Sequence, residues 1–437
     1  MEKLSEFPYF PVQFTKDAGI HNQADVTALQ EFLRQDNTTD LVVISHGWNN
    51  NMEEAKELYT RFLTNLRLLL GSGALPSLSN RKWAVFGVLW PSKKFEEKDL
   101  IPSGAAGVGS VAEMAALKEK LRGLKGVFDA QQADQTLEDL QQLLPKLEDS
   151  TAAQKEFVEK VRSLVRKKAL DDEDGSELFF KVPSGEMIEK LKKPISFEQV
   201  RAPSSGGAAG IGAGGAAGLG QFFTGTWSGI RNLLNYTTYY QMKERAGLIG
   251  ANGLNPILRA IKTEHSGLKL HLVGHSFGGR LVTATVAGAG DATLLQVHTL
   301  SLLQAAFSHY GFSEKWDNTQ NGFFRRVVAG RAVSGPTIIT CTANDKAVGL
   351  AYPIASLLTG EVAAGIGDKN DKYGGIGRNG AQKTPEATDM SLLDVQGPYQ
   401  LMNGRVHNLS TDRFIKDHGD VHNKQVVYAV ASAIATT

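Results

Sequence analysis

The feature that most constrains the fold is an apolar run that ends in a glycine-flanked serine. Residues 268–274 are mostly apolar, and the chain continues as Gly274-His275-Ser276-Phe277-Gly278 into a helical pattern over residues 280–286. A strand, a sharp Gly-x-Ser-x-Gly turn and a helix lift a serine hydroxyl above the edge of a sheet. The two glycines let the flanking chain segments pass closely. We therefore expect an α/β protein in which Ser276 is a nucleophile.

The same alternation of strand-like and helical patterns recurs towards both ends of the chain. Further buried strands are predicted at residues 41–45, 83–90, 297–306 and 337–342, and helices at 52–70 and 423–434. Strands that alternate with helices form βαβ units, whose strands run parallel. The sequence thus predicts a mostly parallel central sheet flanked by helices.

A long insertion, residues 92–235, separates two parts of this predicted core, residues 1–91 and 236–437. It contains three groups of apolar residues at helical spacing, at 117–128, 137–147 and 157–164. Proline ends or bends a helix, so Pro145 limits the second helix, and Ser150 is placed to cap the third. We interpret the insertion as a helical cap, and two roles stay open: a lid over a site, or a solvated decoration.

Glycine- and alanine-rich segments occur within the insertion. Residues 103–110 recur in similar form at 206–213 and 214–221, and no charged residue lies between Arg201 and Arg231. Glycine and alanine supply little transfer free energy, which argues against a membrane span. We expect a mobile apolar lid segment or a closely packed helix pair, with contact to a membrane surface as an alternative. Residues 360–388, rich in Gly, Lys and Asp, are predicted to form a long surface loop.

Charge and cysteine content exclude several classes of protein. The 437 residues carry a formal net charge of +1, which lacks the basic surplus that nucleic-acid binding needs. The single cysteine, Cys341, rules out an internal disulfide and is expected to be a small core residue of a buried strand. The first residues lack the pattern of a signal peptide, so we expect a cytoplasmic protein, with export by another route left open.

A serine nucleophile needs a base, and the base needs an orienting carboxylate. After a nucleophile turn of this type the carboxylate comes next in the chain and the histidine last. Asp345 directly follows the strand predicted at 337–342, and His418 lies just before the last helix. We predict Asp345 as the acid and His418 as the base, with His422 as the alternative base. The remaining candidates, interpreted as loop or distant residues, are Asp412, Asp417, Asp420, His298, His309 and His407.

The oxyanion of acyl transfer needs two backbone N–H donors. One is expected from Phe277, the residue after the nucleophile. The other is expected from Trp48, in the His46-Gly47-Trp48 turn that follows the first predicted strand. We expect His46 itself to bond within its own loop rather than to take part in chemistry.

Together these motifs resemble the α/β-hydrolase superfamily, and more narrowly a bacterial group of serine-esterase-like hydrolases of poorly defined function. The matching pieces are residues 46–49, 89–92, 240–246, 274–278 and 344–348, and His418. The resemblance covers residues 40–90 and 236–434, but not the cap. It implies the α/β-hydrolase fold, with Ser276, Asp345 and His418 at the carboxyl edge of the sheet and with no cofactor or metal.

We expect a serine hydrolase that cleaves carboxylic esters, either a carboxylesterase or a lipase. The same triad would also serve a phospholipase, thioesterase, amidase or peptidase, because pocket shape sets the substrate. The expected partner is a small-molecule or lipid ester. A binding protein on a hydrolase scaffold is a third interpretation, which the intact Ser, Asp and His disfavour.

Overall fold

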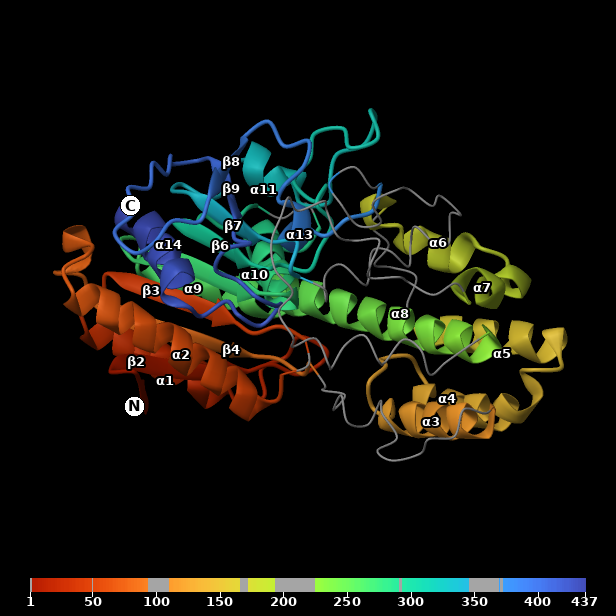
Figure 1. Cartoon of the computed structure of the whole chain (residues 1–437). Coiled ribbons are helices and arrows are strands. Elements are labelled where there is room, and N and C mark those ends of the chain that lie inside the picture. Colours follow the sequence, from red (N-terminus) through yellow and green to blue (C-terminus); the bar gives the residue numbers. More distant parts are fainter. Residues whose placement is uncertain are drawn as a thin grey trace. The chain divides into compact units, whose positions relative to one another are not determined.

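The structure is a computed structural model that describes residues 2–48, 50–92, 110–165, 172–192, 225–290, 293–345, 369 and 372–437. The chain divides into two compact units (Figure 1). The first comprises Met1–Lys93, Met242–Gly349 and Gly374–Thr437, and the second comprises Lys94–Gln241 and Leu350–Tyr373. The predicted division placed the boundaries at residues 91 and 236.

The first unit is built on one sheet, which has nine strands within the described residues. The strands are β1 (Glu2–Leu4), β2 (Phe7–Gln13), β3 (Asp40–Ser45), β4 (Trp83–Leu89), β5 (Lys269–His275), β6 (Thr299–Leu303), β7 (Thr337–Cys341), β8 (Ala387–Ser391) and β9 (Val406–Ser410). Their order is β1-β2-β4-β3-β5-β6-β7-β9-β8. Only the β1–β2 pair is antiparallel among these strands. The prediction of a mostly parallel α/β sheet is confirmed.

Helices cover both faces of the sheet. They are α1 (Gln23–Gln35), α2 (Met52–Gly71), α9 (Asn255–Glu264), α10 (Phe277–Ala287), α11 (Arg325–Ala329), α13 (Ile376–Asn379) and α14 (Lys424–Ala435). On one face, α2 and α14 bury their apolar side chains with Val42, Ile44 and Val273 in a shared core. On the other face, α1 packs on β2, where Phe32 contacts Phe10, and α10 packs on β3, β5 and β6. The alternation of side chains along each strand supplies apolar residues to both faces.

Strand register brings several chain turns to one edge of the sheet. Ser45 of β3 pairs with Gly274 of β5, and His275 pairs with Leu303 of β6. Cys341, at the end of β7, pairs with Ser410 of β9. The turns that follow β3, β5, β6 and β7 therefore leave the sheet at a common carboxyl edge, where a parallel sheet places ligands and catalytic groups.

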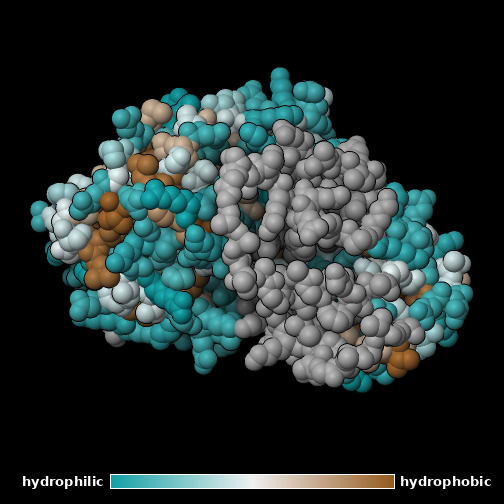
Figure 2. All heavy atoms as spheres, in the orientation of Figure 1, coloured by the Kyte–Doolittle hydropathy of each residue, from teal (hydrophilic) through white to brown (hydrophobic). Residues whose placement is uncertain are grey.

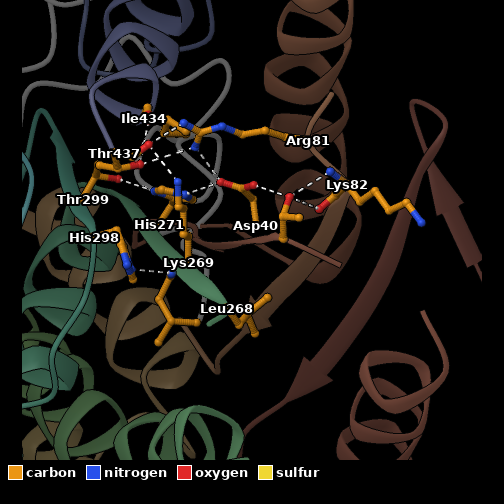
Figure 3. A network of polar contacts seen from close by, with 12 residues as sticks. Asp40, Arg81, Lys82, Leu268, Lys269, His271, His298, Thr299, Ile434 and Thr437 are labelled. Atoms are coloured by element: carbon orange, nitrogen blue, oxygen red, sulfur yellow. Dashed lines mark hydrogen bonds and ion pairs between the residues drawn. The ribbon is translucent and has the colours of Figure 1, made fainter. Parts of the chain in front are cut away.

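A buried polar network lies at the opposite, amino edge of the sheet (Figure 3). The His271 ring joins the Asp40 carboxylate at 2.9 Å to the Thr299 hydroxyl at 3.0 Å. Arg81 donates to Asp40 at 2.9 Å and to the carbonyl oxygen of Thr437 at 2.6 Å, so the network ties β3, β5 and β6 to the end of α14. Burial alone would raise the pKa of Asp40, but hydrogen bonds from His271, Thr39 and Arg81 outweigh it and hold the pKa below its ordinary value.

Two stretches differ from the sequence predictions. The strand β2 was not anticipated, although its residues are largely buried. The stretch 372–388 is not a surface loop, because Ile376 is buried in α13 and β8 begins at Ala387. A Cβ on Gly377 would also clash with the backbone of Gln304, which shows how closely this stretch packs on the sheet. The rest of the predicted loop, apart from residue 369, lies outside the described residues.

Cys341 ends β7 and is partly buried, with its thiol 3.4 Å from the carbonyl oxygen of Leu409. Burial raises the pKa of this thiol to about 12. A thiol with so high a pKa stays protonated and is a poor nucleophile, as expected of a structural residue.

The second unit is helical in the part that the structure describes. Its helices are α3 (Ser110–Gly123), α4 (Ala133–Leu143), α5 (Thr151–Ser163), α6 (Ser176–Lys181), α7 (Ser184–Leu191) and most of α8 (Gly225–Leu248). The apolar residues predicted to form the helix faces are buried, α4 ends before Pro145, and Ser150 caps α5 through the N–H of Ala153. Three predicted helices are therefore confirmed.

The two later Gly/Ala-rich repeats, and all but the last residue of the first, lie outside the described residues. Among the helices that are described, none combines the length and the apolar character needed to cross a membrane. Hydrophobic residues occur in small groups within the mostly hydrophilic described surface that faces the viewer (Figure 2).

Candidate active site

Ser276 occupies the turn between β5 and α10 in a strained backbone conformation, with φ 55° and ψ −125°. A positive φ at a non-glycine residue costs about 1–3 kcal/mol and persists only where neighbours impose it. Here the Ser276 N–H donates to Leu303 at 3.0 Å, and the Ser276 carbonyl accepts from Gly279 and Ala306, each at 2.9 Å. The structure thus gives the predicted strand–turn–helix context. The serine is 5% exposed.

Three glycines make this turn sterically attainable. A Cβ on Gly274 would collide with the carbonyl of Gly278, and a Cβ on Gly278 would collide with the carbonyls of Ser45 and His46. A Cβ on Gly47 would lie 2.5 Å from the Ser276 Cβ and 3.2 Å from its hydroxyl oxygen. The turn after β3 therefore lies directly against Ser276, which is where the predicted oxyanion-binding turn has to lie.

Asp345 and His418 are brought together from the turn after β7 and the segment before α14. The His418 Nδ1 lies 2.8 Å from the Asp345 Oδ2. The carboxylate is fully buried, whereas the His418 side chain is 23% exposed. Because Nδ1 is engaged by the carboxylate, Nε2 is the ring atom left for proton transfer. This is the arrangement by which a carboxylate fixes the tautomer of a catalytic histidine.

Gln304 supports the carboxylate and was not identified from the sequence. It follows β6 with a φ of 45°, and its amide nitrogen lies 3.5 Å from the Asp345 Oδ2. Its amide oxygen accepts from the Thr340 hydroxyl at 2.8 Å, and Thr340 also accepts from the Gln304 N–H at 3.0 Å. These bonds fix the side chain of Gln304 beside Asp345. Its positive φ has no pattern in the sequence that would reveal it.

His275, the residue before the nucleophile, contacts the predicted base and was also missed as a functional residue. Its Nε2 lies 2.8 Å from the carbonyl oxygen of His418, and the two rings lie 4.8 Å apart between centroids. Burial and the nearby His418 lower the pKa of His275 to about 3. The neutral ring therefore donates from Nε2, because a carbonyl only accepts.

Trp48 and Phe277, the predicted oxyanion donors, directly follow Gly47 and Ser276, the two residues at which their turns lie against each other. Phe277 begins α10, and the two aromatic rings lie 6.1 Å apart between centroids. The preceding His46 is fully buried, with Nδ1 2.9 Å from the Gly47 carbonyl and Nε2 accepting from the Trp90 N–H at 3.2 Å. Burial lowers the pKa of His46 to about 4. His46 thus holds the turn in place, as its predicted structural role requires.

The rival acids have other partners. The alternative base His422 is bonded through its backbone, because its carbonyl accepts from Asn65 at 2.7 Å, whereas its ring Nδ1 has no partner among the described residues. Asp412 accepts from the Thr342 hydroxyl and the Ala343 N–H, and so holds the turn that carries Asp345. Asp417 and Asp420 accept backbone N–H groups within their own loop.

The remaining histidines bond elsewhere in the unit. His298 accepts from the Leu270 N–H, His309 contacts Asn379, and His407 contacts Thr388 and Met402.

Metal ligation and the larger hollow do not compete with this site. Across the described residues, His, Cys, Asp and Glu side chains form no group of three or more that could hold a metal ion. A hollow of about 480 Å³ lies beside β8 and β9, away from Ser276. It is lined by Ala381, Gln382, Lys383, Thr384, Pro385, Ala387, Asp389 and Asn408. Two of the polar side chains that line the hollow bond each other, because Asn408 donates to Asp389 at 2.8 Å.

Comparison with known proteins gives no relative: no family model, no curated protein and no solved structure matches the chain. Any function must therefore be argued from the site itself.

Proposed function

We propose that this chain is a serine hydrolase of the α/β-hydrolase fold that cleaves carboxylic esters through an acyl-enzyme. One observation carries the proposal. A strained Ser276, flanked by close-packed glycines, shares a sheet edge with a buried Asp345 bonded to the His418 ring. Strained residues that their neighbours hold in place cluster at active sites, and the Asp–His pair supplies the base that a serine needs.

The proposed reaction uses only groups of this chain. The Ser276 oxygen attacks the substrate carbonyl while the His418 Nε2 takes the serine proton. The backbone N–H groups of Trp48 and Phe277 stabilise the oxyanion. His418 then returns the proton to the leaving alcohol, and water, activated by His418, releases the acid and restores Ser276. The Asp345 carboxylate stabilises the charged imidazole.

The aromatic pair of Trp48 and Phe277 supports an ester with an apolar group near the reacting carbonyl. A phospholipase, thioesterase or amidase would use the same triad, so these activities are outcomes that substrate profiling separates. Contact of the Gly/Ala-rich segment with a membrane surface stays a prediction.

A fluorophosphonate probe tests the nucleophile directly. The probe should label Ser276, identified by peptide mass spectrometry, and Ser276→Ala should abolish both the label and the hydrolysis of p-nitrophenyl esters. Ser313→Ala, at another buried serine, is the matched control and should keep both. An acyl-chain series would then separate short-chain esterase from lipase activity. Folded wild-type protein that takes no label and cleaves no ester would contradict the proposal.

A further inference from the structure

A small cavity lies behind the nucleophile turn within the first unit. Its volume is about 10 Å³, close to the space that one water molecule needs. It is lined by Ile44, Ser45, Leu58, Phe62, Val273, His275, Leu303, Val421 and His422. Apart from two histidine rings and Ser45, these side chains are apolar. A water in this space would therefore depend mainly on the histidines for its hydrogen bonds.

Both histidines present a buried ring nitrogen without a protein partner. Neither the His275 Nδ1 nor the His422 Nδ1 has a hydrogen-bond partner among the described residues. A buried polar atom left unsatisfied destabilises a fold, so two such atoms on residues that line one small cavity indicate a shared ligand. His275 donates from Nε2 to His418, and its Nδ1 is therefore an acceptor. His422 is anchored beside the cavity through its carbonyl, which accepts from Asn65.

We propose that His275 and His422 bind a buried water between their Nδ1 atoms, and that His275 thereby positions the base His418 through the carbonyl of that residue. The water donates a hydrogen bond to the His275 Nδ1. It accepts a hydrogen bond from the His422 Nδ1 or donates one to it. This bond holds His275 in the tautomer that donates from Nε2. His275 and His422 are thus positioning residues, and the inference rests on the proposed function.

The contact has a mechanical consequence for the base. His418 lies on the loop between β9 and α14, and its ring is oriented by Asp345 from one side. The hydrogen bond from His275 links the backbone of His418 to the strand that precedes Ser276. The nucleophile Ser276 is therefore adjacent in the chain to His275, the residue that holds the base His418. A displacement of about 1 Å between reacting groups costs about 100-fold in rate.

Kinetics of His275 variants test the positioning role. His275→Leu removes the donor and should lower kcat about 10- to 100-fold with little change in KM. His275→Gln keeps an N–H at the place of Nε2 and should restore most of kcat. His271→Gln is the matched control, because His271 is equally buried in the same strand but lies in the network at the opposite edge. The kcat of His271→Gln, calculated per folded molecule, should match that of wild type. Thermal unfolding gives the folded fraction of each protein.

Ring nitrogen chemical shifts give a measurement that does not depend on activity. In ¹⁵N-labelled protein, the His275 ring should be neutral with the proton on Nε2. The substitution His422→Leu should shift the Nδ1 resonance of His275 without changing the tautomer of His275. A His275 ring protonated on Nδ1 would overturn the inference. So would an active enzyme whose kcat is unchanged in His275→Leu, or one that His275→Gln fails to restore. Folded wild-type protein without fluorophosphonate labelling would overturn the proposed function and this inference together.

Discussion

At the scale of single residues, two histidine–aspartate pairs in this protein have similar contact distances but use different ring nitrogens and have different surroundings. His418 contacts Asp345 at 2.8 Å, and His271 contacts Asp40 at 2.9 Å with a Thr299 hydroxyl on its other nitrogen. The second pair is fully buried at the amino edge of the sheet, so substrate has no access to it. The His418 side chain is 23% exposed and lies at the carboxyl edge. Under the proposed function, solvent access rather than the hydrogen bond distinguishes the pair that acts in catalysis from the structural pair.

Replacing Asp345 with asparagine should reduce kcat by about 10⁴-fold while the protein stays folded. The amide no longer stabilises the imidazolium and can favour the wrong tautomer of His418. Steady-state kinetics on a p-nitrophenyl ester measure the loss, and circular dichroism checks the fold. Asp417→Asn, at the exposed neighbour of His418, is the control and should change kcat little. Equal activity of Asp345→Asn and wild type would exclude Asp345 as the orienting acid.

Replacing Asp40 with alanine should instead lower stability and spare catalysis. The substitution leaves His271 without its acceptor and removes the carboxylate that pairs with Arg81 at 2.9 Å. Loss of one partner from a buried ionic pair costs about 3–5 kcal/mol. Denaturant unfolding measures the change, with exposed Asp36→Ala as a control that should cost less than about 0.5 kcal/mol. A folded Asp40→Ala enzyme with a strongly reduced kcat would argue against a purely structural network.

At the scale of elements, the site depends on how closely the turns after β3 and β5 approach each other. Gly47→Ala would place a methyl group 2.5 Å from the Ser276 Cβ, so the turn after β3 must move away from the nucleophile. We expect a loss of kcat/KM of about 100-fold, because the donor of Trp48 moves with the turn. Gly267→Ala, where a Cβ has nothing within 4 Å, should leave kcat/KM unchanged. Unaltered fluorophosphonate labelling of Gly47→Ala would show that the turn does not shape the site.

Elements with a strong local pattern could be predicted from the sequence, and elements defined by distant neighbours could not. The helix α2 follows from its apolar periodicity, and the strand β3 follows from a short continuous apolar run. The strand β2 contains Pro8 and Pro11, which lack an N–H and normally argue against a strand between two others. It forms because β1 and β4 pair with it on either side.

The same distinction holds for the candidate site. Ser276, Asp345 and His418 could be proposed because each follows or precedes a recognisable element in a fixed chain order. Gln304 and His275 could not, since their roles depend on strand register. Gln304 reaches Asp345 only because β6 and β7 are neighbours, and the His275 side chain meets a carbonyl 143 positions later in the chain.

At the scale of the whole molecule, six histidines share one electrostatic property. Burial is the first cause that lowers the pKa of each: His46, His271, His275, His298, His309 and His407. The pKa falls to about 4 for His46 and to about 3 for His275 and His309. Each folded ring is therefore neutral at a pH where the same ring in an unfolded chain, with its ordinary value of 6.5, binds a proton.

The free energy of unfolding should consequently fall as the pH drops from 7 to 5. Because the folded pKa values lie below the unfolded value, this stability is fully present above about pH 6.5 and is lost as the pH falls below it. Each fully buried ring contributes a slope of up to about 1.4 kcal/mol per pH unit. Denaturant unfolding at several pH values measures this slope. His309→Gln should lower the slope by the amount that corresponds to one proton, because the His309 ring is wholly buried. Stability that stays constant or rises between pH 7 and pH 5 would show that these rings are protonated in the folded protein.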